Sequence, residues 1–263
     1  MRTIVDSVPT VLLVLIVVGA VVGTVLLAVF AVRRWLPETR DGFDAEVSSQ
    51  MLGVVASLFG LLLAFVVVIE FQAFSAAGDT VRNEADNLEA IVRDSYAFDP
   101  SAGAAVRSSI GTYARTVVAR EWPLMRDGKE SPAARDAIDG VFSAMQAYKP
   151  VSTSQVAFYD DSVRHLNSVL EGRSDRLGAS DGNDLPALIA ALILVGAVVI
   201  LGYATLVGSK SSGFHAVGAG AIAVVVGFSL VVLITLQFPF SGGLAIDSQP
   251  FREGALAPFF QPK

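Results

Sequence analysis

The hydrophobic positions of this chain fall into four long windows that are nearly free of charge. These windows cover residues 11–32, 51–69, 185–207 and 214–236. Each has the roughly 20 residues that a helix needs to cross the hydrocarbon core of a bilayer. Only helices and closed barrels satisfy their backbone hydrogen bonds in lipid, and continuous apolar runs of this length are helices. The pattern therefore predicts an all-α membrane protein with four transmembrane helices.

Short polar links join the first window to the second and the third to the fourth, which predicts two transmembrane hairpins. A cleaved signal peptide is the alternative for the first window. Its apolar run is too long for a signal sequence, and Arg33, Arg34 and Trp35 follow it in place of a small-residue cleavage site. We interpret the window as a membrane anchor. Small residues spaced four apart, Gly19 with Gly23 and Ala223 with Gly227, predict close contacts between helices.

Between the second and third windows, apolar residues recur every three or four positions, with charged residues between them. This spacing is typical of amphipathic helices. Four seams follow one another: Val81, Ala85, Leu88 and Val92; Val106, Ile110, Tyr113 and Val117; Ala134, Ile138, Val141 and Met145; Val156, Tyr159, Val163, Leu166 and Leu170. Ser131 and Ser154 are predicted to cap the third and fourth helices. Four such helices with short links predict a bundle in which the fourth seam packs against the first.

The chain is thereby predicted to divide into four segments. Residues 1–75 form the first transmembrane hairpin, and residues 76–184 form a charged helical bundle inserted between the second and third spans. Residues 185–237 form the second hairpin. Residues 238–263, rich in proline and glycine, are predicted to form an irregular tail.

The composition of the chain excludes several kinds of catalytic and metal-binding site. The chain has no cysteine, which excludes disulfides, thiol catalysis and thiolate metal sites. Its two histidines, His165 and His215, are predicted to lie far apart and make a poor metal site. It has no phosphate-cradling glycine loop and no Gly-x-Ser-x-Gly turn. We therefore expect no enzyme activity, no metal and no cofactor. The middle domain carries mixed charges without a basic stripe, so no nucleic-acid partner is expected.

Two features of the second window are candidates for function. Glu70 is a carboxylate at the end of an apolar run, where it is either part of a site that faces a cavity or an interfacial side chain that reaches headgroup water. Leu61, Phe65 and Ile69 lie four residues apart, in line with Ser57. They form either a packing stripe or, if several subunits surround an axis, an apolar constriction that excludes ions by drying out.

The charges beside the spans favour one orientation. Arg33, Arg34 and Lys210 flank the spans in the two short loops. Because basic residues accumulate on the cytoplasmic side, the middle domain and both termini are predicted to lie outside the cytoplasm. The bias disappears when residues farther from the spans are included.

Several short segments, in order along nearly the whole chain, resemble a bacterial family of four-span membrane proteins described as bestrophin-like. The similar segments are residues 32–37, 60–68, 83–88, Tyr113, 121–123, Arg173, 176–177, 239–242 and 250–251. The first reads Val-Arg-Arg-Trp-Leu-Pro, the third Asn-Glu-Ala-Asp-Asn-Leu and the fifth Glu-Trp-Pro.

The resemblance implies similarity to bestrophins, pentameric anion channels whose second helix lines the pore with an apolar neck. It implies a homo-oligomer with Leu61 and Phe65 in that neck. Ser57 departs from the pattern, because an apolar residue is expected there, and a ring of Glu70 carboxylates would repel anions unless protonated or paired. The bestrophin layout also implies a cytoplasmic middle domain, against the charge pattern.

We therefore predict a multi-pass protein of the plasma membrane whose surroundings are the lipid bilayer and further copies of itself. Its predicted function is that of an oligomeric, bestrophin-like ion channel, and anions are the ions that we expect it to conduct. The predicted pore-lining residues are Leu61, Phe65, Ile69 and Glu70. The alternative is a membrane-anchored scaffold or sensor whose helical domain binds a partner.

Overall fold

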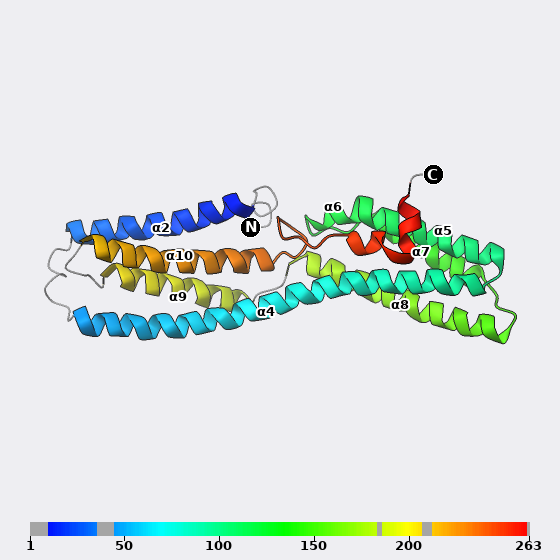
Figure 1. Ribbon diagram of the computed structural model, residues 1–263, viewed down its shortest axis with the longest axis horizontal. Helices are drawn as coiled ribbons and strands as arrows, with labels where there is room; N and C mark the ends of the chain where they lie inside the picture. Colours follow the sequence, from blue (N-terminus) through cyan, green and yellow to red (C-terminus); the bar gives the residue numbers. More distant parts are fainter. Residues whose placement is uncertain (1–9, 36–44, 183–185, 207–211, 262–263) are drawn as a thin grey trace. The chain divides into compact units, whose positions relative to one another are not determined.

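The computed structural model describes residues 10–35, 45–182, 186–206 and 212–261, which form two compact units (Figure 1). The membrane unit takes its described residues from 10–72 and 186–237. The bundle unit takes them from 73–182 and 238–261. Helix α4 (Ala45–Asp94) supplies residues to both units. No strand occurs among the residues that the structure describes.

Among the residues that the structure describes, four helices are long and apolar enough to cross a membrane. They are α2 (Thr10–Trp35), α4, α9 (Ala187–Leu206) and α10 (Ser212–Leu236). The predicted all-α membrane protein with four spans is confirmed. Long runs of Val, Leu, Ile and Ala leave these helices without polar breaks, and their outward side chains remain largely uncovered by protein, as expected for helices solvated by lipid.

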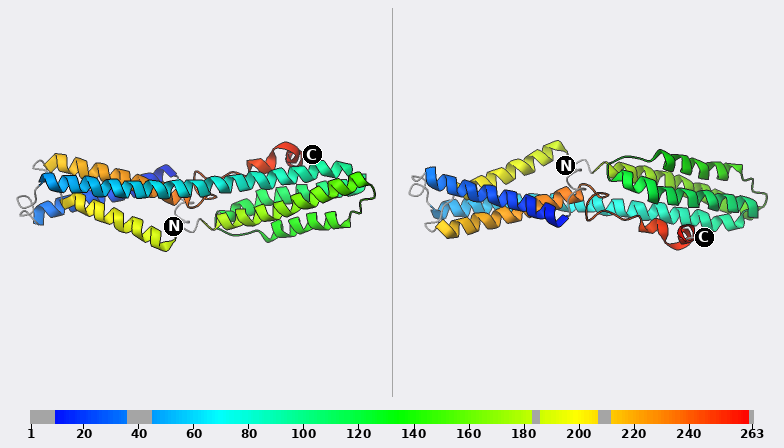
Figure 2. Two further views of the ribbon diagram at one scale, coloured as in Figure 1. Left: turned by 90° about the horizontal axis from the view of Figure 1, so that it is seen from below. Right: turned by 90° about the horizontal axis from the view of Figure 1, so that it is seen from above.

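The membrane unit is held together by small contact clusters between its helices. Helix α2 packs chiefly against α10, where Val25 and Val29 meet Ala219 and Ala223. Helix α4 joins the unit through Leu63 and Val66, which are packed with Ile193 of α9 and Leu233 of α10. Figure 2 shows that α9 diverges from the membrane part of α4 toward the start of α9.

Two glycines allow the membrane helices to approach closely. A Cβ atom on Gly227 would lie 3.2 Å from Cα of Val18, and one on Gly196 would lie 2.5 Å from the Phe59 ring. The predicted close contact at Ala223 and Gly227 is therefore present. By contrast, a Cβ on Gly19 or Gly23 would meet no described atom within 4 Å. Those two glycines do not mediate close packing within the chain as described.

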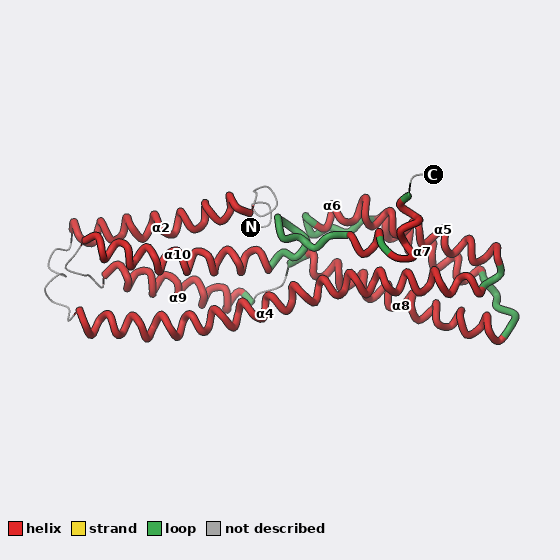
Figure 3. The backbone as a smooth tube through the Cα atoms, in the orientation of Figure 1, coloured by secondary structure: helices red, strands yellow, loops and turns green. Residues whose placement is uncertain are grey.

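The bundle unit contains the four predicted amphipathic helices (Figure 3). They are the second part of α4, α5 (Pro100–Thr116), α7 (Pro132–Ala147) and α8 (Thr153–Ser180). One continuous core holds most of their seam residues, including Val81, Leu88, Ile110, Val141 and Leu166. Val156, at the start of the fourth seam, is 41% exposed and lies outside the core.

Capping residues set the starts of the last two bundle helices. The Ser131 hydroxyl accepts a hydrogen bond from the Ala134 amide, as predicted. Helix α8 begins after Ser152, not Ser154, because Ser152 and Gln155 form a reciprocal capping box that satisfies two backbone amides. Helix α8 ends at Ser180.

Two shorter elements complete the bundle unit. A π-helical turn, η2 (Val117–Glu121), follows α5 and leads into α6 (Trp122–Met125), while a 3₁₀ turn, η1 (Ser95–Ala97), ends α4. The tail is more regular than predicted, because 3₁₀ helices η3 (Gln249–Arg252) and η4 (Gly254–Phe260) form in it. Its side chains Phe240, Phe251 and Leu256 are buried in the bundle core, and this packing orders the segment.

Candidate functional site

The four predicted pore-lining residues lie in the membrane part of α4 but do not share one face. Leu61, Phe65 and Ile69 are 56%, 63% and 61% exposed, whereas Glu70 is 5% exposed. Glu70 directly follows Ile69, and the rotation of about 100° between them places it on the packed side of α4. Leu61, Phe65 and Ile69 thus share an exposed face that Glu70 does not share, and the pore-lining role of the four residues stays a prediction.

The exposed residues of α4 form a stripe opposite the contact with the other membrane helices. Leu63 and Val66, which face α9 and α10, are buried. With 100° of rotation per residue, Leu61 and Phe65 point away from that contact. Ser57 continues the stripe, and its hydroxyl donates to the Gly53 carbonyl oxygen at 2.8 Å. The stripe thus presents apolar side chains and one internally satisfied hydroxyl.

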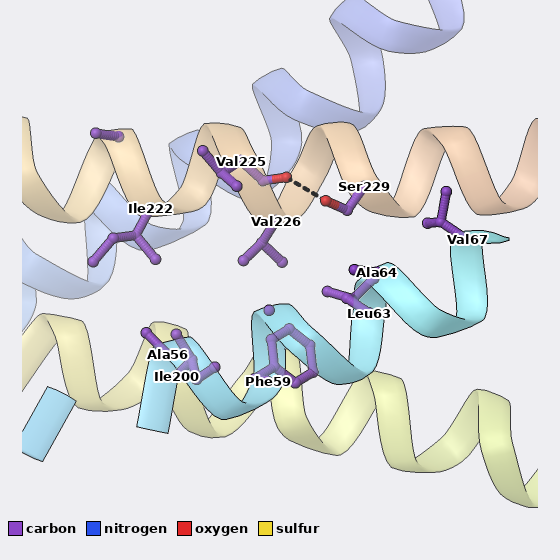
Figure 4. Close-up of a pocket in the computed structure, with 12 residues that line it drawn as sticks. Ala56, Phe59, Leu63, Ala64, Val67, Ile200, Ile222, Val225, Val226 and Ser229 are labelled. Atoms are coloured by element: carbon purple, nitrogen blue, oxygen red, sulfur yellow. Dashed lines mark hydrogen bonds between the residues drawn. The ribbon is translucent and has the colours of Figure 1, made fainter. Parts of the chain in front are cut away.

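A cavity of about 510 Å³ lies on another side of α4, between α4, α9 and α10 (Figure 4). Leu63 of α4 and Val226 of α10 point toward each other across it. Among the described residues that line it, Ser229 alone has a polar side chain, and its hydroxyl donates to the Val225 carbonyl oxygen at 2.9 Å. The full lining consists of Ala56, Phe59, Gly60, Leu63, Ala64, Val67, Ile200, Ala221, Ile222, Val225, Val226 and Ser229. This cavity offers no group for acid–base, nucleophilic or metal chemistry.

The charged centre of the protein lies in the bundle unit, around the fully buried Arg176 of α8. Its guanidinium donates to the Glu84 carboxylate of α4, through Nε at 2.7 Å and Nη2 at 3.1 Å. Nη2 also donates to Oε2 of Glu121 at 3.0 Å, while Nη1 contacts Sδ of Met125 at 2.8 Å. One guanidinium therefore links three segments of the bundle. We call Glu84, Tyr113, Glu121, Arg173 and Arg176 the Arg176 cluster.

A second arginine and a tyrosine complete this cluster. Arg173 donates to Glu121 Oε1 at 2.6 Å from the next turn of α8. The Tyr113 hydroxyl of α5 donates to Glu84 Oε1 at 2.6 Å. Two carboxylates thus face two guanidinium groups, so the buried charges balance. Buried ions are tolerated when they are paired and their remaining hydrogen-bonding positions are filled.

The environment shifts the ionisation of these groups in consistent directions. Burial alone would raise the pKa of Glu121, but the hydrogen bond from Arg173 and the charge of Arg176 outweigh it, and the pKa lies below its usual value. Burial alone would lower the pKa of Arg176, but the Glu84 carboxylate more than compensates and raises it. Burial, reinforced by Glu84, raises the pKa of Tyr113 well above its usual range. Glu121, Arg176 and Tyr113 therefore keep their ordinary charge near neutral pH.

Aromatic side chains cover the Arg176 guanidinium. Its central carbon lies 5.3 Å from the Trp122 ring centre and 5.7 Å from that of Phe251, and the two rings meet edge-on. Both contacts are within the range of cation–π interactions. Phe251 belongs to the tail, so a segment far along the chain completes the surroundings of the cluster.

The turn η2 positions Glu121 for its two arginine partners. A π-helix has wider turns than an α-helix and is often found at functional or strained sites. Glu121 is the last residue of this turn and is fully buried. Its Oε1 also accepts from the backbone amide of Ser131 at 3.3 Å. The carboxylates of the Arg176 cluster accept hydrogen bonds from donors within the chain. The cluster therefore serves to hold the bundle helices together through ion pairs.

Reasoning from the sequence did not predict this cluster, although its residues were singled out for another reason. Glu84, Tyr113, Glu121, Arg173 and Arg176 all lie in the segments that carried the family resemblance. The structure brings together residues that are up to 92 positions apart. Their separation in sequence hides the pairing, since ionic partners carry no periodic signal.

The histidines do not assemble a metal site among the residues that the structure describes. His165 Nδ1 lies 2.8 Å from Oδ1 of Asn87, in the bundle unit. His215 lies in α10, in the membrane unit. Within the described ranges, no three His, Cys, Asp or Glu side chains are close enough to hold a metal ion.

Comparison with known families assigns these features to one family. A Bestrophin-like domain matches residues 19–251, which include most of the first span, the other three spans, the bundle helices and Phe251. The chain belongs to the Bestrophin-like family. Neither the curated proteins nor the solved structures include a match to the chain. This Bestrophin-like protein is thus a membrane protein with four spans, and the segments that first suggested the family include every residue of the Arg176 cluster.

Proposed function

We propose that this Bestrophin-like protein is an oligomeric ion channel of the plasma membrane, without catalytic activity, in which copies of α4 surround a narrow apolar passage. Leu61, Phe65 and Ile69 would line the passage. The observation that carries this proposal is the exposed stripe of α4, which points away from the rest of its own membrane unit.

The chemistry of the stripe suits an ion gate. Bulky apolar side chains around a narrow axis exclude water, so an ion would lose its hydration without gaining a partner. Shortening or wetting those side chains lowers this barrier. A passage of this kind requires several copies, since one copy contributes only one wall. Family membership favours a ring of five with selectivity for anions. Glu70 stays outside the proposed passage, because its side chain is buried on the packed side of α4.

Ion flux through reconstituted vesicles tests the proposal. Phe65→Ala and Leu61→Ser should raise anion flux several-fold above the wild type without changing the size of the oligomer. Matched controls lie on α2, where Phe30 and Leu27 are 69% and 70% exposed. Phe30→Ala and Leu27→Ser remove the same groups from a helix outside the proposed passage and should leave the flux unchanged.

The same measurement separates the channel from its alternative, a scaffold or sensor whose bundle unit binds a partner. The alternative predicts that stripe variants change assembly alone. If the wild type and both variants conduct no anion or cation across a range of pH, the channel proposal fails. A monomer in mild detergent and in lipid nanodiscs would contradict it as well, because no axis would then exist.

The orientation of the protein belongs to the same proposal. Arg33 and Arg34 end α2 and support a cytoplasmic position for that end of the helix. Lys210, the third residue of the charge argument, lies outside the described residues. A reporter fused at Lys129 should then show the bundle unit outside the cytoplasm, and one at Lys210 the opposite side. A cytoplasmic signal from Lys129 would reverse the orientation and agree with the bestrophin layout.

A further inference from the structure

We propose that the cavity between α4, α9 and α10 is a binding site for one acyl chain of a membrane phospholipid. The cavity lies within helices that cross the membrane, so the medium around it is hydrocarbon. Its volume of about 510 Å³ falls within the roughly 300–1,000 Å³ range of small-molecule sites. Its lining is apolar apart from Ser229, whose hydroxyl bonds to its own helix. The inference does not depend on the channel proposal.

The length and the apolar lining of the cavity suit a single hydrocarbon chain. Its lining on α4 extends from Ala56 to Val67, about 16 Å at 1.5 Å per residue. The apolar lining along this length matches an extended chain of methylene groups, whose carbon atoms would contact the wall side chains at about 4 Å.

Small residues line the open side of the cavity, and larger side chains line its inner wall. Small residues, Gly60 and Ala64 on α4 and Ala221 on α10, leave its side open. Leu63 and Val226 face each other deeper in the unit and are buried (Figure 4). An acyl chain that enters past the small residues would contact the two buried side chains. The missing contacts between α4 and α10 would then be supplied by lipid.

Glycines on α4 provide a matched pair of variants. A Cβ on Gly60 meets no described atom within 4 Å, so Gly60→Leu places a side chain in the cavity without a backbone clash. A Cβ on Gly53, two turns earlier and outside the lining, also meets no described atom within 4 Å. Gly53→Leu is therefore the control. Ala221→Phe fills the cavity from the opposite wall, with Val217→Phe, 71% exposed on the same helix, as its control.

Photolabelling in vesicles tests the site with a phosphatidylglycerol that carries a diazirine in the middle of one acyl chain. After illumination and digestion, mass spectrometry locates the adducts. We expect several-fold more adducts on the cavity segments of α4 and α10 than on the exposed face of α2. Gly60→Leu and Ala221→Phe should remove this excess, whereas Gly53→Leu and Val217→Phe should keep it. A phospholipid with its diazirine in the headgroup should not label the cavity.

Three results would overturn the proposal. Equal labelling of the cavity and of α2 would mean that only bulk lipid touches these helices. An excess that survives both filling variants would mean that the adducts form outside the cavity. The third result concerns a second copy of the chain. Because the chain lacks cysteine, Ala64→Cys introduces a single thiol at the cavity, and a high yield of disulfide-linked dimers would show that another copy fills it. If the filling variants do not fold, the comparison of the two diazirine positions in the wild type decides the question.

Discussion

The membrane unit and the bundle unit are both built from long helices, but they use polar and apolar residues in opposite ways. In the bundle unit, apolar seams are buried in one core and a set of charged groups is enclosed with them. In the membrane unit, large apolar residues such as Phe65 and Leu27 are among the most exposed. Burial of apolar surface drives folding in water but adds little between helices in lipid. Side-chain truncations should therefore have unequal effects in the two units.

The largest loss of stability is expected from Arg176→Met. This substitution removes the guanidinium but leaves Glu84 and Glu121 buried without their shared partner. Breaking a buried ion pair in this way costs about 3–5 kcal/mol. Denaturation of the solubilised protein, followed by Trp122 fluorescence in a Trp35→Phe background, measures the effect. The sequence contains only these two tryptophans.

The control for this prediction is an exposed arginine of the same helix bundle. Arg82 pairs with Asp79 at 3.1 Å, and its side chain is 70% exposed. Arg82→Met should change stability by about 0.5 kcal/mol or less. Equal effects of the two substitutions would contradict the distinction between buried and exposed charge. Combining Arg176→Met with Glu84→Leu and Glu121→Leu should recover part of the loss, because no buried charge then lacks a partner.

A loss of similar or slightly smaller size is expected when the tail is detached from the bundle core. Phe251 is fully buried and contacts both Trp122 and Arg176. Phe251→Ala should cost about 3–5 kcal/mol, the usual effect of truncating a core phenylalanine. Phe158→Ala, at a position 41% exposed, should cost much less in the same denaturation experiment. If the two variants are equally stable, the tail does not contribute to the core.

Acid should weaken the bundle unit through Glu121. Its pKa is lowered in the folded protein because Arg173 and Arg176 outweigh the effect of burial. The unfolded chain therefore binds a proton at higher pH than the folded one, so stability falls as pH drops from about 4.5 toward the folded pKa. Stability curves between pH 7 and 3 measure this slope. Glu121→Gln should flatten the slope while lowering stability at neutral pH, and an unchanged slope would assign the acid sensitivity to other groups.

The smallest effect on stability is expected for Phe65→Ala in the membrane unit. Its ring is 63% exposed and points away from the other membrane helices. The substitution should therefore change the stability of the solubilised protein by about 1 kcal/mol or less. Comparing the thermal unfolding of the Phe65→Ala and Phe251→Ala variants measures the difference between the two units. A loss as large as that of Phe251→Ala would show that Phe65 is buried, for example against another copy.

Much of the fold could be predicted because its signals are local. The four spans are long apolar runs, and the bundle seams repeat every three or four residues, as Leu88 and Leu166 illustrate. Ser131 was identified as a cap from its own neighbours in sequence. The order in the tail was missed because it comes from contacts of Phe240 and Phe251 with distant helices, which no local pattern records.

The candidate sites were less predictable for a different reason. The exposed stripe at Leu61 follows from helical spacing, but the position of Glu70 on the packed side depends on which face of α4 meets its neighbours. Glu84 and Arg176 come from separate helices and fit each other only after the bundle forms. The cavity between α4 and α10 depends on the gap left by small residues on two helices, so it has no signature in either segment alone.

The π-helical turn Val117–Glu121 also makes the bundle sensitive to the number of residues in this stretch. A π-helical turn is wider than an α-helical turn and holds more residues, so its side chains point in other directions than they would in a regular α-helix. Because a regular α-helix advances the side chains by about 100° per residue and the wider π-turn by less, winding these five residues as α-helix would rotate everything that follows relative to α5. Trp122 and Met125 would then face away from Arg176, even though no side chain had been replaced. An insertion between α5 and α6 should therefore be far more damaging than most substitutions at the same positions, and the winding of this segment is as much a part of the fold's specification as its composition.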